Sequence, residues 1–274
     1  MALQDTRIAF IGGGNMATAI IGGLLRQGLP AAHVQVVEPW SEARARLARD
    51  LGVKSDAAAG PALGRAQLVV WAVKPQAFRE AAQPVAAHAA AALHLSVAAG
   101  IRSDSIARWL ASERVVRCMP NTPALVGRGM TALFARPGVA DPDRALAEQV
   151  LAPTGATLWV DQEAQLDAVT ALSGSGPAYV FYFIEAMAKA GEEMGLPPAK
   201  ALQLAIGTFT GAAELARTAG DPPQVLRERV TSKGGTTYAA LTSMEQAGVA
   251  RHFVAAMHAA CRRAAELGDE FGRD

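Results

Sequence analysis

Three consecutive glycines at positions 12–14 join two segments of different character near the start of the chain. Residues 7–12 are apolar and predict a short strand, and residues 15–27 have the periodicity of a helix. With Ala17 three residues after the last glycine, the turn fits the pattern GxGxxG/A. The first glycine of this pattern permits a tight turn, the second leaves room for a pyrophosphate, and the small last residue lets the helix approach the sheet. Because amides at a helix start attract anions, the segment predicts a dinucleotide site.

Strand and helix patterns continue to alternate over the first half of the chain. Further strands are expected at 33–38, 67–73, 93–97, 115–119, 130–135 and 156–160, and helices at 42–51, 75–88, 103–111 and 141–151. Apolar strands separated by helices indicate a parallel sheet that is covered on both faces. Because crossovers between parallel strands are right-handed, the expected fold is α/β, with a Rossmann-type doubly wound sheet in a dinucleotide-binding domain over residues 1–162.

The pattern changes after about residue 162, where no further strand is indicated. Helices are expected at 164–172, 176–194, 198–218, 222–230, 236–247 and 249–270. Asp221 before Pro222 predicts an N-cap with proline in the first helical turn. We therefore expect a second, all-helical domain over residues 163–274.

One of these helices is apolar on nearly every side. Residues 178–188 read AYVFYFIEAMA, and a helix of this kind must be buried all round. A small helical domain has little interior in which to bury it, so a second subunit is the simpler cover. We expect a homo-oligomer in which residues 163–274 form the substrate and dimerisation domain. Burial against the first domain is the alternative.

Composition and charge exclude several classes of protein. The formal net charge is +1 without a basic cluster, which argues against nucleic-acid binding. The two cysteines, Cys118 and Cys261, lie far apart and lack metal-ligand spacing, so we expect no metal site and two reduced thiols. Residues 86–100, the longest weakly polar stretch, are too few and too polar to span a bilayer. Because the N-terminus also lacks the pattern of a signal peptide, we expect a cytoplasmic protein and no membrane partner.

Glu38 stands at the end of the second expected strand, where it bears on the choice of cofactor. An acidic residue at this position normally accepts hydrogen bonds from both ribose hydroxyls, which favours NADH. Arg44 and Arg46 follow in the next helix and are placed to reach the 2′-phosphate of NADPH. The cofactor is therefore expected to be NADPH or NADH. In the alternative interpretation, Glu38 is only a solvated strand end.

Other candidates for cofactor contact follow the later strands, because ligands of open α/β sheets lie at the carboxyl ends of the strands. Lys74 either contacts the ligand or, with Pro75, only begins a helix. Asn121 either fixes the nicotinamide carboxamide or a nearby loop, or hydrogen-bonds only backbone in a turn. The expected cofactor contacts are Ile11, Gly12, Gly13, Gly14, Asn15, Met16, Glu38, Ala72, Val73, Lys74, Pro75, Val97, Ala98, Ala99 and Asn121.

A second glycine-rich helix entrance lies in the other half of the chain. Residues 230–237 read VTSKGGTT and lead into the helix expected at 236–247. A loop of small and polar residues at a helix start is suited to a carboxylate, for the same reason that the first glycine turn suits a phosphate. The alternative is an N-cap with a glycine turn and no ligand.

Several segments together resemble the pyrroline-5-carboxylate reductase family, in order from about residue 7 to residue 265. They are GGGNM at 12–16, AVKP at 72–75, MPNTPA at 119–124, SGSGPAY at 173–179, MGLP at 194–197 and VTSKGGTT at 230–237. The resemblance implies an oxidoreductase that reduces 1-pyrroline-5-carboxylate to L-proline by hydride transfer from NAD(P)H, the last step of proline biosynthesis. It also implies a homo-oligomer of the dimer or decamer-of-dimers type.

The resemblance also implies the residues that bind the substrate. Thr237 would hydrogen-bond the ring nitrogen as the catalytic residue, and the amides of Gly235, Thr236 and Thr237 would hold the carboxylate, with Ser232 beside them. Three positions depart from the family pattern and leave their roles open, and one of them is Glu38, which stands where some NADPH-preferring relatives carry serine. Lys233 stands where proline is common, and Arg229 stands where some relatives carry asparagine.

Two other functions fit parts of the sequence. Related Rossmann dehydrogenases that act on 3-hydroxy acids also pair a nucleotide domain with a helical one, but they usually carry a catalytic lysine early in the second half. Lys189 and Lys200 are the candidates for it here, and neither lies in such a motif. A non-enzymatic NAD(P)-binding protein would have no need of the loop at 230–237.

Overall fold

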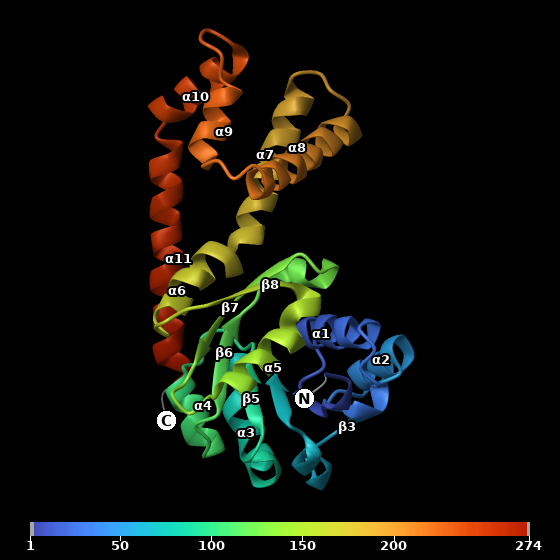
Figure 1. Cartoon of the computed structure of the whole chain (residues 1–274). Helices are drawn as coiled ribbons and strands as arrows, with labels where there is room; N and C mark the ends of the chain where they lie inside the picture. Colours follow the sequence, from blue (N-terminus) through green and yellow to red (C-terminus); the bar gives the residue numbers. More distant parts are fainter. Residues whose placement is uncertain (1–2, 273–274) are drawn as a thin grey trace. The chain divides into compact units, whose positions relative to one another are not determined.

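The computed structural model describes residues 3–272 and divides into two compact units (Figure 1). The first unit holds the chain up to Gly174 together with the chain from Ala260 onward, and the second holds residues 175–259. These units differ from the expected ranges 1–162 and 163–274, because residues 163–174 pack with the sheet. In that segment, helix α6 (Gln165–Val169) contacts strands β6 and β7.

The first unit is built on one eight-stranded sheet with the order β3-β2-β1-β4-β5-β6-β7-β8. The strands are β1 (Ile8–Ile11), β2 (Val34–Val37), β3 (Ser55–Asp56), β4 (Leu68–Trp71), β5 (Leu93–Ser96), β6 (Val115–Met119), β7 (Gly129–Ala135) and β8 (Gly155–Trp159). The expected doubly wound parallel sheet is confirmed, with one exception. β7 runs antiparallel to β6, because only the short 3-10 turn at Thr122–Val126 joins them, whereas a parallel pair needs a longer crossover.

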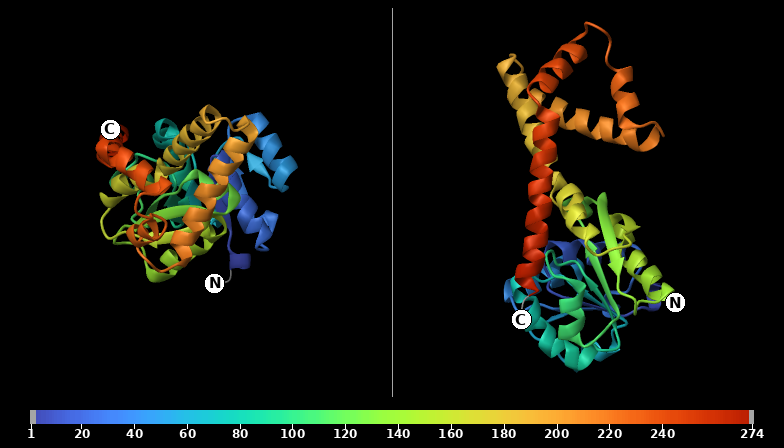
Figure 2. Two further views of the ribbon diagram at one scale, coloured as in Figure 1. Left: turned by 90° about the horizontal axis from the view of Figure 1, so that it is seen from above. Right: turned by 90° about the vertical axis from the view of Figure 1, so that its left-hand side faces the viewer.

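Helices cover both faces of this sheet (Figures 1 and 2). They are α1 (Asn15–Arg26), α2 (Ser41–Leu51), α3 (Pro75–Ala89), α4 (Ser103–Leu110) and α5 (Asp141–Leu151). Alternate residues of β1 enter two separate cores. Phe10 packs with the buried side chains of α1, α2 and α5, and Ile11 packs with those of α3 and α4. The sheet is therefore apolar on both faces, as strands of this composition require.

The second unit contains helices α7 (Gly176–Glu193), α8 (Pro198–Thr218), α9 (Pro223–Arg229), α10 (Thr236–Gln246) and the first part of α11 (Val249–Phe271). Helices α7 and α8 pack closely, and a Cβ added at Gly191 would lie 2.9 Å from the Cβ of Ala201. The rings of Tyr179 and Phe253 meet edge to face, with centroids 5.7 Å apart. The expectation of an all-helical second part is confirmed.

The N-cap predicted at Asp221 is wrong. Helix α9 begins at Pro223 with Pro222 in the cap position, and no side chain caps it. The Asp221 carboxylate instead accepts a hydrogen bond from the Arg229 guanidinium at 2.5 Å. An ion pair with Arg229, the last residue of α9, therefore takes the place of the predicted cap.

Helix α7 leaves large apolar side chains uncovered within one chain. Phe181 is 58% exposed and Tyr182 is 69% exposed, although residues 178–188 were expected to be buried all round. Other exposed apolar side chains of this unit are Val180, Met187, Met194, Leu196, Leu202, Leu204, Ile206, Leu215, Val230, Tyr238, Met244, Val249 and Val254. An apolar surface of this extent marks a site of protein association.

The end of helix α11 packs against the segment that follows β5. Gly100 has φ +73°, and a Cβ there would lie 3.1 Å from the ring of Phe271. The Arg102 guanidinium lies 3.5 Å from carboxylate oxygens of both Asp167 and Asp269. The last turns of the described chain are thus part of the first unit.

Cys118 is buried and Cys261 is partly buried, and both are free thiols, as expected. None of the helices formed by residues 3–272 combines the length and apolar character needed to span a membrane. Within the same residues, His, Cys, Asp and Glu side chains do not gather in a group of three or more that would hold a metal ion.

Candidate active site

The glycine turn after β1 is shaped by close contact with β4. Gly12 has φ +96°, and a Cβ there would lie 2.6 Å from the carbonyl oxygen of Ala72. Only glycine fits this position without strain. A Cβ at Gly14 would meet no atom within 4 Å, so space is open in front of it. Ala17 is fully buried against the sheet. These three positions have the environments that a pyrophosphate turn requires.

Helix α1 presents its first amides beside this open space. It begins at Asn15 with Gly14 in the cap position, and Gly14 has no side chain with which to cap the first turn. The first four amides of a helix have no partner within the helix, and together they carry part of the positive end of its dipole. The amides of Asn15, Met16 and Ala17 are therefore suited to an anion.

Glu38 is buried at the end of β2, with only 6% of its surface exposed. One carboxylate oxygen accepts a hydrogen bond from the Gly13 amide at 2.8 Å, and the other accepts one from the Trp40 amide at 3.0 Å. The interpretation as a solvated strand end is therefore wrong. The predicted contact with the cofactor ribose remains a prediction.

The two arginines after Glu38 are engaged with backbone carbonyls. One terminal nitrogen of Arg44 donates to the carbonyls of Glu38 at 2.8 Å and Pro39 at 2.7 Å. Arg46 donates to the Gly13 carbonyl at 3.5 Å, which is a weak contact. Arg44 thus braces the backbone at Glu38 and Pro39, whereas Arg46 contacts the glycine turn.

A mostly apolar cavity of about 320 Å³ opens between the ends of β1, β2 and β4 and helix α3. Its walls include Gly12, Val37, Pro39, Ala58, Val73 and Ala81. A slot of small aliphatic side chains next to an anion site is suited to a flat aromatic base. The adenine of a dinucleotide would fit here, with its pyrophosphate at the glycine turn.

The next two strands end at the same rim of the sheet. Ala72 and Val73 follow β4, and Lys74 occupies the cap position of α3 with Pro75 in its first turn. The amide of Val97, after β5, donates to the Trp71 carbonyl at 3.0 Å. The segment then continues through Ala98, which is buried, to Ala99, which is exposed. Lys74 and Ala99 are accessible to a ligand, and small side chains at 98–99 leave the rim open.

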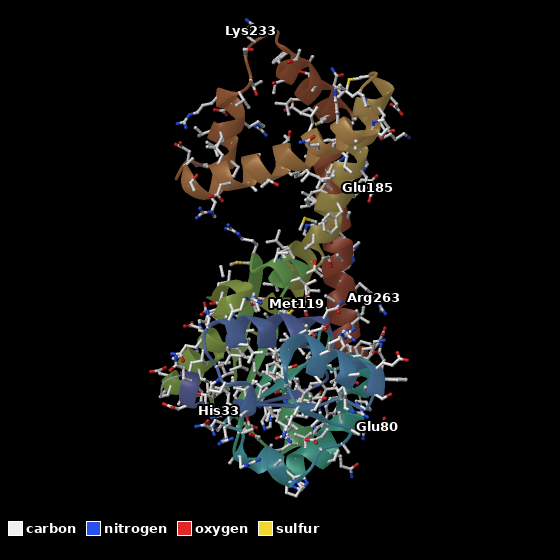
Figure 3. All side chains as sticks on the ribbon, turned by 90° about the vertical axis from the view of Figure 1, so that its right-hand side faces the viewer. His33, Glu80, Met119, Glu185, Lys233 and Arg263 are labelled. Atoms are coloured by element: carbon white, nitrogen blue, oxygen red, sulfur yellow. The ribbon has the colours of Figure 1, made fainter. Side chains whose placement is uncertain are left out.

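Asn121 fixes a nearby loop. Its side-chain oxygen accepts a hydrogen bond from the Met130 amide at 2.9 Å, and its nitrogen donates to Ser173 at 3.2 and 3.3 Å. The next residue, Gly174, lies close to the side chain of Met119, which Figure 3 labels, and a Cβ at Gly174 would overlap with that side chain. Contact of Asn121 with a cofactor remains a prediction.

The second glycine-rich entrance lies at the start of helix α10, in the other compact unit. Gly234 has φ +75°, and Gly235 occupies the cap position of α10 without a side-chain cap. The Gly235 amide donates to the carbonyl of Ser232 at 3.0 Å, which closes the turn. Thr237 is half-buried, whereas Lys233 is exposed at the tip of the loop (Figure 3). The first amides of α10 are thus suited to a carboxylate.

One ionisable group below the rim has a strongly shifted pKa. His94, on β5, is fully buried, and its Nδ1 accepts a hydrogen bond from the Trp71 indole at 3.2 Å. Burial, with Arg114 nearby as a second cause, lowers the pKa of His94 to about 4. Trp71 in turn stacks on Phe78 with ring centroids 4.6 Å apart. His94 therefore belongs to the core, and it stays neutral at physiological pH.

A buried ion pair that the sequence does not indicate holds the start of helix α4. Arg117, on β6, is 3% exposed and donates to the Glu163 carboxylate at 2.9 Å. The same carboxylate accepts hydrogen bonds from the amide and hydroxyl of Ser103 at 2.6 and 2.5 Å. These residues lie 46 and 60 positions apart, so no local pattern indicates the contact.

Comparisons with known proteins agree with this architecture. Residues 163–267 match the family described as pyrroline-5-carboxylate reductase dimerisation, which supports a homo-oligomer. Residues 7–100 match the family described as NADP oxidoreductase, coenzyme F420-dependent. The chain resembles a solved pyrroline-5-carboxylate reductase from Coxiella burnetii with a TM-score of 0.89 and 36% identity, covering 96% of this chain and 98% of that one.

Two further relatives extend the comparison. A Plasmodium falciparum pyrroline carboxylate reductase, solved with NADP bound, has a TM-score of 0.87 and 25% identity over 97% of this chain and 100% of that one. The pyrroline-5-carboxylate reductase of Pseudomonas aeruginosa is 45% identical over 99% of this chain and all of its own length. With this identity over nearly its whole length, the chain belongs to the pyrroline-5-carboxylate reductase family.

Proposed function

We propose that this chain reduces 1-pyrroline-5-carboxylate to L-proline by hydride transfer from NADH or NADPH, as the last step of proline biosynthesis. The observation that carries the proposal is the 45% identity over 99% of the chain to a relative of that name. The two helix entrances support it, because one suits a pyrophosphate and the other suits a carboxylate. The reaction needs one site of each kind.

The nucleotide would be held by the first unit. The open space at Gly14 and the first amides of α1 fit a pyrophosphate, and the cavity bounded by Val37 and Pro39 fits the adenine. The remaining predicted contacts, from Ala72 to Pro75 and from Val97 to Ala99, would surround the nicotinamide half. When bound, the reduced nicotinamide supplies the hydride, and the protein supplies its position.

The substrate would be held by the loop before α10. In the proposed arrangement the amides of Gly235, Thr236 and Thr237 hold the carboxylate, with Ser232 beside them. The Thr237 hydroxyl hydrogen-bonds the ring nitrogen. As hydride adds to the imine carbon, the electron pair of the C=N bond moves to nitrogen, which takes up a proton. Because a threonine hydroxyl is a weak acid, Thr237 orients the ring and relays a proton from water.

Oxidation of NADH or NADPH in the presence of pyrroline-5-carboxylate tests the proposal, with proline measured as the product. Thr237→Ala is expected to lower kcat by roughly a hundredfold, the usual contribution of a positioned proton-transfer group, while the circular dichroism spectrum stays unchanged. Ser243→Ala, an exposed position on the same helix, serves as the control. Absence of turnover with both cofactors would contradict the function, and full turnover of Thr237→Ala would remove that residue from the mechanism.

We also propose the finer assignments of domain, assembly and location. Residues 1–162 serve as the dinucleotide-binding domain and residues 163–274 as the substrate and oligomerisation domain, supported by the family match at 163–267; within the second range, residues 163–174 and 260–272 pack with the first compact unit. The assembly is a dimer or a decamer of dimers, without nucleic-acid or membrane partners, which light scattering of the full chain would test. Two free cysteines and the use of a reduced nicotinamide cofactor support a cytoplasmic location.

A further inference from the structure

We infer that Glu38 makes this chain select NADH over NADPH. The inference rests on the proposed function and specifies its cofactor. It starts from the position of the carboxylate. Glu38 lies between Val37 and Pro39, which both line the apolar cavity, and its side chain lies against Gly13 in the pyrophosphate turn. In a bound dinucleotide, the adenosine ribose joins the base to the pyrophosphate. It would therefore pass over Glu38.

The carboxylate has acceptor capacity left for this ribose. An ionised carboxylate offers about four lone-pair positions. The amides of Gly13 and Trp40 occupy one position on each oxygen. The others remain for two hydroxyl donors, which are what the 2′ and 3′ positions of NADH present. Glu38 can thus accept hydrogen bonds from the backbone amides and from the ribose at the same time.

The same contacts prevent the carboxylate from moving away from a phosphate. Both oxygens are held by backbone amides at 2.8 and 3.0 Å, and a Cβ at Gly13 would lie 3.4 Å from the Glu38 side chain. The 2′-phosphate of NADPH would bring about two negative charges close to this fixed, nearly buried carboxylate. Repulsion of like charges at close range is strong where water is scarce.

Arg44 is the feature that would favour the opposite preference, since a nearby arginine accommodates the 2′-phosphate in other Rossmann folds. Here one of its terminal nitrogens donates to the carbonyls of both Glu38 and Pro39. Its guanidinium is therefore held against the backbone that carries Glu38. The Plasmodium falciparum relative was solved with NADP bound, so the choice of cofactor has to be decided on the residues of each chain.

Binding of the two reduced cofactors to the full chain, measured without substrate by titration calorimetry, tests the inference. Wild-type protein is expected to bind NADH at least about tenfold more tightly than NADPH, a difference of about 1.4 kcal/mol. Glu38→Gln removes the charge and is expected to bring the ratio of the two dissociation constants close to one. Glu38→Asp keeps the charge and is expected to keep the preference, even if both cofactors bind more weakly.

Two further variants distinguish the effect of Glu38 from that of the charged side chains near it. Glu42→Gln removes a charge from an exposed position in the first turn of α2, and it is expected to leave the ratio unchanged. Arg44→Ala is expected to weaken both cofactors by a similar factor. Equal binding of NADH and NADPH by the wild type, or an equal shift of the ratio in Glu42→Gln, would overturn the inference. So would a selective loss of NADPH binding in Arg44→Ala.

These outcomes can be distinguished from those that test the proposed reaction. A chain that discriminates between the cofactors but oxidises neither with pyrroline-5-carboxylate would fail the proposed function and keep the inference about Glu38. A chain that reduces the substrate equally well with both cofactors would keep the function and lose the inference.

Discussion

Replacing His94 with glutamine should remove a large part of the acid sensitivity of the nucleotide-binding unit. The pKa of His94 falls from an ordinary 6.5 to about 4 because the ring is buried in the core, where a charged imidazolium is poorly solvated. In the unfolded chain the ring takes up a proton below about pH 6.5, whereas in the folded chain it does so only near pH 4. The unfolded state therefore binds more protons over this range, and the folded state loses stability as the pH falls through it.

The size of the effect follows from the two pKa values. A difference of one pKa unit corresponds to 1.36 kcal/mol, so the complete shift from 6.5 to about 4 amounts to about 3 kcal/mol. About 2 kcal/mol of this is already lost at a pH of about 5. In His94→Gln the amide is neutral throughout, so this part of the pH dependence should disappear. The glutamine oxygen can still accept the hydrogen bond from the Trp71 indole.

Urea unfolding of the full chain at pH values of about 7.5 and about 5, at one fixed protein concentration, measures the effect. Tryptophan fluorescence is a direct probe, because Trp71 contacts the histidine ring. The difference in unfolding free energy between the two pH values should be smaller in His94→Gln than in the wild type by about 2 kcal/mol. An equal difference in the two proteins would refute the assignment of this acid sensitivity to His94.

Three further predictions concern the turn, the buried ion pair and the exposed helix. Gly12→Ala should lower the unfolding free energy by roughly 1–3 kcal/mol and abolish cofactor binding, because the added Cβ meets Ala72 at a positive φ; unaltered NADH affinity would contradict this account. Glu163→Ala should cost roughly 3–5 kcal/mol by leaving Arg117 buried without its partner, and a loss below about 1 kcal/mol in urea unfolding would show that water replaces the carboxylate. Phe181→Glu should shift the chain towards smaller species in light scattering, and an unchanged mass would place the subunit contact elsewhere.

The strands and helices with strong hydrophobic periodicity were predictable from the sequence, and so was the glycine turn. The burial of each strand on both faces produces the continuous apolar runs from which the parallel sheet was predicted. The direction of β7 was not predictable from its composition, because it depends on the length of the connection from β6. The short strand β3 (Ser55–Asp56) has two residues, which is too few for a periodic pattern.

Long-range polar contacts account for most of what the sequence did not indicate about the site. Glu38 was identified by its place at a strand end, but its bonds to Gly13 and Trp40 depend on how two separate turns meet. The side chain of Asn121 bonds to Met130 and Ser173, which lie 9 and 52 positions further along the chain. Asp221 shows the same effect at short range, because a strong partner nearby replaced the cap that its local sequence favours.

The path of the chain makes the second unit an insertion within the first. The chain leaves the nucleotide-binding unit after Gly174 and returns to it at Ala260, so the two units are joined by two peptide connections. A single proteolytic cut at either connection would divide the chain into two fragments, which only the non-covalent packing of the first unit would hold together. Because Leu267 and Phe271 pack against Gly100, a tag or truncation at the C-terminus would perturb the cofactor-binding half of the enzyme.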